Sequence, residues 1–139
     1  WRPTGHWLQE MPFRKLIYLG SSAPEPGEIL IEGEPGRPGR GVSLKRRRSP
    51  WDPARPIERV IVGSHPARAD VLIDADGIEP EHIRLYLPVD GGGKNDLKVI
   101  VDGTVKVNGR PVRHTEWYAL QDSDELDFSS WLFRFEDGS

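Results

Sequence analysis

Four carboxylates and a histidine lie within nine residues and are the side chains whose types and spacing most resemble a chemical site. The carboxylates are Asp74, Asp76, Glu79 and Glu81, and the histidine is His82. Alternating acids are typical of calcium loops, but the EF-hand spacing fails because the later oxygen ligands are not in register. An acid before a histidine also suggests acid-base chemistry. We expect instead a solvated, acidic loop tip that favours basic partner segments.

No catalytic constellation accompanies these residues. The chain lacks Gly-x-Ser-x-Gly, His-Glu-x-x-His and Gly-x-x-x-x-Gly-Lys, the patterns of serine hydrolases, zinc proteases and phosphate-cradling loops. The histidines at positions 6, 65, 82 and 114 do not have metal-ligand spacing, and cysteine is absent. We therefore expect no enzymatic activity, no metal and no cofactor.

A basic run, Lys45 to Arg48, is followed by Ser49 and Pro50. Such a run suits contact with nucleic acid or acidic lipid, nuclear import, or phosphorylation at Ser49. It is short, it has no interleaved aromatic residues, and its surroundings are rich in proline and glycine. A solvated loop is the expected structure, with phosphorylation of Ser49 or contact with an anionic partner as the alternatives.

Charge is unevenly distributed along the 139 residues. The net charge is −3, but residues 1–55 hold 10 basic and 6 acidic residues, whereas residues 56–139 hold 9 and 16. The acidic C-terminal part argues against a nucleic-acid partner. No segment approaches the roughly 18 apolar residues of a membrane span. The absence of cysteine favours a reducing compartment, on the cytoplasmic or nucleoplasmic side.

Apolar and β-branched residues alternate in short segments between Gly, Pro, Asp and Asn clusters, which is the pattern of β-strands. The expected strands are 16–19, 28–32, 42–45, 57–62, 71–73, 82–87, 97–101, 105–107, 117–120, 125–128 and 131–135. No window sustains a helical period. With 36% apolar residues the chain suits one domain. The prediction is an all-β fold, a two-sheet antiparallel sandwich.

The N-terminal part departs from this regularity. Residues 20–56 are rich in proline and glycine, which favour turns and remove backbone donors, so we expect long loops around one or two edge strands. Residues 1–12 are expected to be a linker or flexible N-terminus, and residues 13–139 the sandwich. Because the first residue is Trp1 rather than Met, we expect a segment of a larger protein.

Six short motifs follow one another from Ile57 onward. They are Ile-Val-Gly-Ser at 61–64, Ala-Asp-Val-Leu-Ile at 69–73, Glu-Pro-Glu-His at 79–82, Asp-Gly-Thr at 102–104, Val-Asn-Gly at 107–109, and the closing segments 120–126 and 133–135. In order and spacing, residues 57–137 resemble the forkhead-associated domain. That family is a β-sandwich that typically reads phosphothreonine peptides through loops at one end.

The differences from the family fall on its ligand-binding positions. An arginine after the glycine and the serine of Ser-x-x-His hold the phosphate in the family, and the asparagine of Asn-Gly holds the peptide backbone. Here these places carry Ser64, Glu79 and Asp102. A carboxylate beside a phosphate is repulsive, so we expect phosphothreonine reading to be lost. The alternative is phosphopeptide binding through substituted ligands, Arg68 and His65.

The resemblance assigns structural roles to four further residues. His82 is expected to hydrogen-bond across the base of its loop. The other three, Gly63, Gly103 and Gly109, are expected where the backbone approaches closely or needs a positive φ.

The predicted function is a non-catalytic protein-interaction domain whose loop end binds a protein or peptide without requiring phosphothreonine. The expected binding residues are Ser64, His65, Arg68, Glu79, Glu81, Asp102 and Asn108. A further alternative is a structural domain that forms homo-oligomers through a sheet face, which exposure of Trp117 or Trp131 on that face would favour.

Overall fold

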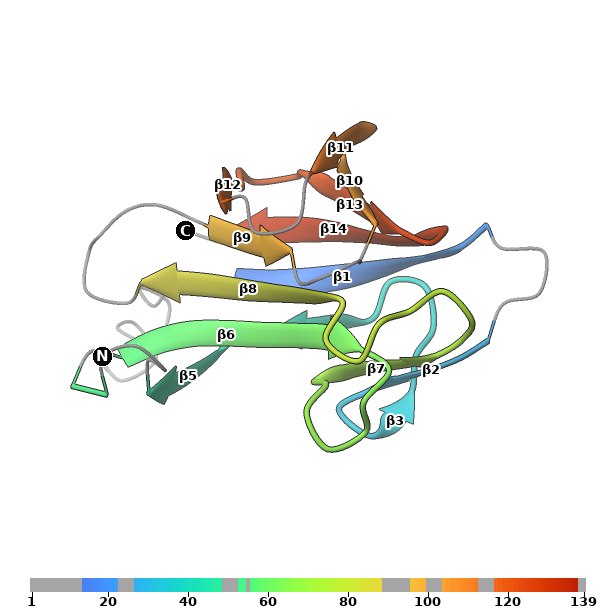
Figure 1. The fold of residues 1–139 in the computed structure, drawn as a ribbon, viewed down its shortest axis with the longest axis horizontal. Coiled ribbons are helices and arrows are strands. Elements are labelled where there is room, and N and C mark those ends of the chain that lie inside the picture. Colours follow the sequence, from blue (N-terminus) through green and yellow to red (C-terminus); the bar gives the residue numbers. More distant parts are fainter. Residues whose placement is uncertain are drawn as a thin grey trace, which may run out of the picture.

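The computed structural model describes residues 14–22, 27–48, 53–54, 56–88, 96–99, 104–112 and 117–137. Strands alone make up the regular structure of these residues (Figure 1). They are β1 Arg14–Ser21, β2 Glu28–Ile31, β3 Glu34–Pro35, β4 Gly41–Ser43, β5 Lys45–Arg48, β6 Pro56–Gly63, β7 Val71–Asp74, β8 Ile83–Pro88, β9 Asp96–Val99, β10 Val105–Val107, β11 Arg110–Val112, β12 Trp117–Ala119, β13 Glu125–Phe128 and β14 Trp131–Asp137. Within this part of the chain, no helix is long and apolar enough to cross a membrane. The expected linker, residues 1–12, lies outside the described residues.

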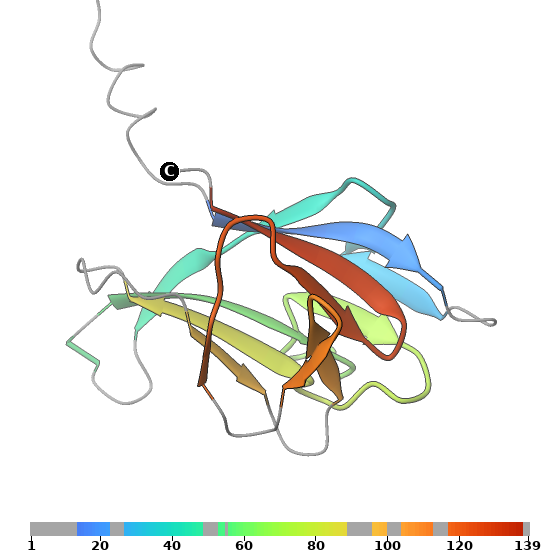
Figure 2. The same cartoon turned by 90° about the horizontal axis from the view of Figure 1, so that it is seen from above.

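The strands form two sheets, which pack against each other as the layers of a sandwich (Figure 2). One sheet has the order β11-β10-β13-β14-β1-β4. The other has the order β12-β9-β8-β6-β7-β2-β3, and β5 also pairs with β6. Neighbouring strands are antiparallel apart from β6 and β7, which are parallel. The all-β sandwich predicted from the sequence is confirmed.

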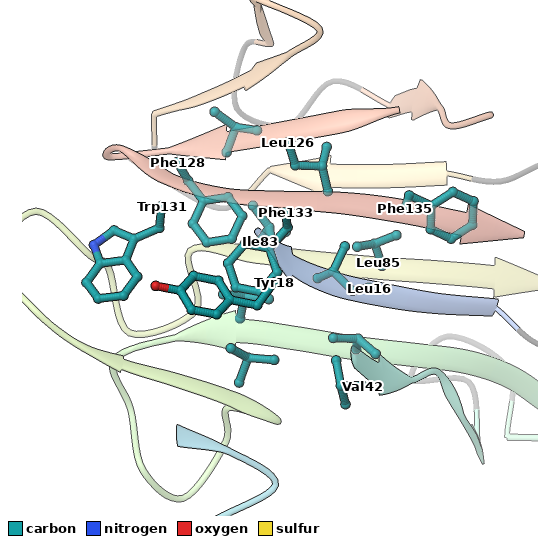
Figure 3. Packing of buried hydrophobic residues seen from close by; sticks show 14 of the residues in the cluster. Leu16, Tyr18, Val42, Ile83, Leu85, Leu126, Phe128, Trp131, Phe133 and Phe135 are labelled. Atoms are coloured by element: carbon teal, nitrogen blue, oxygen red, sulfur yellow. The ribbon is translucent and has the colours of Figure 1, made fainter. Parts of the chain in front are cut away.

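The core lies between the sheets because side chains alternate along each strand. Phe133 and Phe135 of β14 are buried from one sheet, and Ile83 and Leu85 of β8 from the other (Figure 3). The ring of Phe133 stacks on that of Phe128, with 5.0 Å between the centroids. This shared apolar layer fixes which face of each strand remains outside, and it therefore fixes the surface side chains as well.

Trp131 belongs to this core. It is only 2% exposed, and its ring stacks on Tyr18 with 6.1 Å between the centroids. It therefore gives no support to the alternative of oligomerisation through an exposed tryptophan. The side chain of Trp117, on which that alternative also depended, lies outside the described part of the structure.

The N-terminal part contains more strand than expected, since β2 to β5 all lie within residues 20–56. The basic run expected as a solvated loop is instead β5, which pairs with β6 from Lys45 opposite Arg59 to Arg48 opposite Pro56. Pairing with a long neighbouring strand overrides the local composition here. The short strands β3 and β11 were also not expected, because two or three residues carry no readable alternation.

Candidate functional site

The end of β6 lies directly against the loop between β7 and β8. The amide of Ser64 donates to the carbonyl oxygen of Glu79 at 3.0 Å, and the amide of His65 donates to that of Pro80 at 3.2 Å. A Cβ built on Gly63 would overlap the carbonyl oxygen of Pro80. The close backbone approach requires glycine at this position. These bonds make the loop base rigid.

His82 lies buried beneath the same loop, with 1% of its surface exposed. Its Nδ1 accepts a hydrogen bond from the amide of Glu79 at 3.2 Å, and its Nε2 lies 3.0 Å from the carbonyl oxygen of Thr104. This pair of partners requires the neutral Nε2–H tautomer. Burial lowers the pKa of His82, although the Thr104 hydrogen bond and the charge of Glu79 oppose that effect. The imidazole thus joins the loop to the start of β10.

Ser64 is engaged within the protein. Its hydroxyl donates to the carbonyl oxygen of Ile78 at 3.0 Å, in addition to the backbone bond with Glu79. The serine side chain therefore closes the loop base rather than pointing a free donor toward solvent.

The carboxylates of the loop differ from Ser64 and His82 in their contacts with the rest of the protein. In the described residues, no ion pair involves Asp74, Asp76 or Glu79. Asp74 and Asp76 are exposed. Among the described residues, the negative charge of the loop tip is therefore not paired with a cation.

A serine turn holds the opposite side of this loop. Ser129 and Ser130 connect β13 to β14 with φ of +52° and +73°, and the Ser129 hydroxyl donates to the carbonyl oxygen of Gly77 at 3.0 Å. Positive φ at two central residues is the geometry of a tight hairpin turn, where Asn-Gly is usual. This contact could not be predicted from the sequence, because Ser-Ser is not a typical pair for such a turn.

Arg68 is held by an ion pair in which its Nη1 lies 3.0 Å from Glu81 Oε2. The other oxygen of Glu81 lies 3.2 Å from Nε of Arg84. The Arg68 side chain is 62% exposed, whereas that of Glu81 is 16% exposed. The proposed substitute ligand for phosphate therefore has a carboxylate partner of its own.

The structure separates Asn108 from the other expected binding residues. It follows the C-terminal end of β10, while Thr104, the partner of His82, precedes the N-terminal end. Its amide group donates to Asp124 at 2.9 Å and accepts from the backbone of Glu125 at 3.0 Å. Asn108 thus lies at the opposite end of β10 from Thr104, and its side chain bonds residues at the start of β13.

Several expectations fall on residues that the structure does not describe. They are Asp102 and Gly103 of the expected ligand turn, and Ser49 of the expected phosphorylation site. Gly109, by contrast, is described and has a φ of +82°, which favours glycine. No group of three or more potential metal ligands occurs among the described residues.

Comparisons with known proteins identify the fold. No protein-family model and no curated protein matches the sequence. Among solved structures, a forkhead-associated domain from Chlamydia trachomatis is similar with a TM-score of 0.63 and 18% identity, over 91% of this chain and 99% of that one. The chain has the fold of forkhead-associated domains.

Two further structures with this fold come from different settings. One is the forkhead-associated domain of MEK1 in complex with a phosphothreonine peptide from HOP1, with a TM-score of 0.58, 13% identity, and coverage of 82% of this chain and 98% of that one. The other is the cytoplasmic domain of PscD, a sorting-platform protein of the Pseudomonas aeruginosa type III secretion system. It has a TM-score of 0.56, 19% identity, and coverage of 89% and 79%.

Sequence reasoning missed a second feature of this forkhead-associated fold, a groove lined largely by arginines. It has a volume of about 520 Å³ and includes Arg47, Arg59, Arg68 and Arg84 in its lining. These residues lie on different strands and on one loop, so they are dispersed in the sequence. A partial signal was nevertheless present, because Arg59 and Arg84 alternate with the core residues Val60 and Leu85 in their strands.

Proposed function

We propose that this chain is a non-catalytic protein-interaction domain whose loop end binds a basic segment of a partner without reading phosphothreonine. The proposed surface combines the loop base at Ser64 and His65 with the acidic tip at Asp74, Asp76 and Glu79. Arg68 and Glu81 flank it. Asp102 belongs to the proposal by its place in the sequence, and Asn108 is left out.

The observation that carries this proposal is the arrangement of charge at the loop base. Ser64 stands where the family resemblance places an arginine, and its hydroxyl is bound to Ile78. Glu79 stands where the resemblance places a serine. Replacing a charge-assisted contact by a neutral one forfeits about 1.5–3 kcal/mol. A carboxylate about 4 Å from a phosphate adds a repulsion of about 1–4 kcal/mol per unit charge.

The lost contact and the added repulsion together would remove a large part of the roughly 8 kcal/mol of binding free energy that a micromolar complex requires. The same uncompensated carboxylates would attract lysine or arginine side chains. The neighbours leave this choice open, since one is bound to a phosphothreonine peptide and another is part of a secretion apparatus. The proposal therefore rests on the residues of this chain at the loop base and tip.

The test is an NMR titration of the full chain with a phosphothreonine peptide library and with its unphosphorylated copy. Backbone amides of Ser64, Glu79 and Thr104 report on the loop end. We expect no saturable shift that depends on phosphate. Saturable shifts with the phosphorylated library alone would contradict the proposal and would assign the phosphate to Arg68.

A second measurement tests the preference for a basic partner. A peptide of alternating arginine and serine should bind at the loop end, and the double variant Asp76→Asn/Glu79→Gln should weaken that binding by about tenfold. Glu125→Gln is the matched control, because Glu125 is exposed at the other end of β13, beside Asn108. Equal losses in the test and control variants would show non-specific attraction and would overturn the basic preference.

A further inference from the structure

The arginine groove lies on the face of the eight-stranded sheet that points away from the core. Val60, Val62 and Leu85 belong to the core cluster, so the alternate residues Arg59, Ile61 and Arg84 face outward. Ile61 is 4% exposed and forms part of the groove wall although it is outside the core cluster. The fold thus gathers separate arginines on one surface.

The loop from Ala67 to Asp70 closes one side of the groove, and Arg47 of β5 contributes to its lining. Asp70 fastens this side, since its Oδ2 accepts from the amide of Ile61 at 2.9 Å and its Oδ1 accepts from Arg47 at 2.9 Å. Along β6, residues 56–59 pair with β5 and residues 62–63 pair with β7. Asp70 bonds to Ile61, which lies between these two paired sections. Hydrogen bonds from the backbone of β6 and from Arg47 to Asp70 therefore hold this side of the groove in place.

Charge within the groove is unbalanced. Four arginines and two carboxylates, Asp70 and Glu81, line it, which leaves a charge of +2. Both carboxylates are already committed, because Asp70 holds Arg47 while Glu81 lies between Arg68 and Arg84. Arg59 has neither an ion pair nor a hydrogen bond from its guanidinium among the described residues.

Buried donors of the groove also lack acceptors. The Nε atoms of Arg47 and Arg59 are buried and make no hydrogen bond. Nε of Arg84 lies within ion-pair distance of Glu81 but is not directed at it for a hydrogen bond. Buried polar groups in native proteins nearly always have a partner, and charged donors left without one are costly. Because these Nε atoms have almost no accessible surface, an oxyanion in the groove would bind the terminal nitrogens of the same guanidinium groups.

We propose that this groove binds an acidic segment of a partner protein, with side-chain carboxylates directed to Arg59 and Arg84. Its volume lies within the range of ligand-binding clefts, but its lining is charged, which suits carboxylates rather than an apolar molecule. A nucleic acid fits less well, because Asp70 and Glu81 line the groove and the protein carries a net charge of −3. The groove shares Arg68 and Glu81 with the flank of the proposed loop-end surface, but this proposal does not depend on the loop-end interaction.

The test is a fluorescence-anisotropy titration of the full chain with a labelled peptide of alternating glutamate and serine. In an extended peptide this alternation places the glutamates on one side. A matched peptide with glutamine in place of glutamate measures the contribution of charge. An oligodeoxynucleotide of equal charge and inorganic phosphate are titrated in parallel.

Arg59→Gln is the principal variant, because the Arg59 guanidinium has no ion pair to lose among the described residues and its Nε makes no hydrogen bond. Arg68→Gln is the second variant, from the loop that closes one side of the groove. Arg46→Gln is the control. Arg46 is exposed on the face of β5 opposite to that of Arg47, and its substitution removes the same charge. Thermal unfolding confirms that each variant is folded.

We expect saturable binding of the glutamate peptide, a loss of about tenfold in Arg59→Gln and Arg68→Gln, and less than twofold in Arg46→Gln. The glutamine peptide and inorganic phosphate alone should bind more weakly. Equal losses in Arg46→Gln and Arg59→Gln, or no binding of the glutamate peptide, would overturn the proposal. Tighter binding of the oligodeoxynucleotide would overturn it too and would reassign the groove to nucleic acid.

Discussion

The loop end and the arginine groove carry opposite charges and use their hydrogen-bonding groups in opposite ways. At the loop end, Ser64 and His82 have protein partners, while the acids at the tip are uncompensated. In the groove the two acids are paired, while Arg59 and the buried Nε atoms are not. The comparison shows that a loop base whose polar groups bond within the protein and a groove of net positive charge occur in one fold.

The largest effect should come from breaking the loop base at Gly63. Gly63→Ala places a Cβ against the backbone of Pro80, which cannot move without disrupting the bonds from Ser64 and His65. We expect a loss of about 3 kcal/mol or more in the free energy of unfolding, measured by urea denaturation.

Gly109→Ala is the control for that variant. Gly109 has a φ of +82° but nothing within 4 Å of a built Cβ, so only backbone strain of about 1–2 kcal/mol applies. If both alanine variants lost the same free energy, close approach at Gly63 would not be the reason for glycine there.

Removing the imidazole beneath the loop should have the next largest effect. His82→Ala leaves the amide of Glu79 and the carbonyl of Thr104 without their partner, and we expect a loss of about 2–4 kcal/mol. Hydrogen exchange at the Glu79 amide should rise, while glutamate-peptide binding in the groove should be unchanged. Loss of groove binding in the folded variant would show that the two regions are not independent.

The titration of His82 should give a smaller effect. Burial lowers its pKa in the folded protein, so the unfolded chain binds more protons over the interval between the two pKa values. Its contribution to stability is therefore complete above the unfolded pKa of about 6.5 and is lost as the pH falls below it. Urea unfolding from pH 7.5 to pH 5 should show this slope, and His82→Gln should reduce it. An unchanged slope in His82→Gln would assign the pH dependence to other groups.

Removing the unpaired arginine should have the smallest effect on stability. Arg59→Gln should change the free energy of unfolding by no more than about 0.5 kcal/mol, because Arg59 has no ion pair with another described residue. Arg14→Gln, measured alongside, removes a part-buried 2.8 Å ion pair with Glu58 and should cost about 1–3 kcal/mol. A large loss in Arg59→Gln would mean that Arg59 supports the fold rather than a ligand.

Much of the fold could be predicted from the sequence because strand alternation is local. The period-two pattern of Trp131 to Phe135 identified β14, for example, and it also explains why these aromatic residues are buried. The basic run from Lys45 to Arg48 could not be assigned in this way, because its strand depends on pairing with β6. Composition is a poor guide where a neighbouring strand supplies the hydrogen bonds.

The candidate site was less predictable than the fold. The family resemblance drew attention to Ser64, Glu79 and His82, which the structure does bring together around one loop base. It gave no warning about Asn108, because a single strand separates that residue from Thr104. The groove was not predicted for a related reason, since Arg47, Arg59 and Arg84 become neighbours only when β5, β6 and β8 pair.

The most direct test of the contrast between the two regions is an NMR titration of one isotope-labelled sample with the glutamate-serine peptide and then with the arginine-serine peptide. The glutamate peptide should shift the Nε–H signals of Arg59 and Arg84, while the arginine peptide should shift the amides of Asp76 and Glu79. Two separate sets of shifted residues would support an acidic loop end and a basic groove acting independently. If the glutamate peptide shifted the amide signals of Ser64 and Glu79, this account would be contradicted, because the loop end would then bind anions.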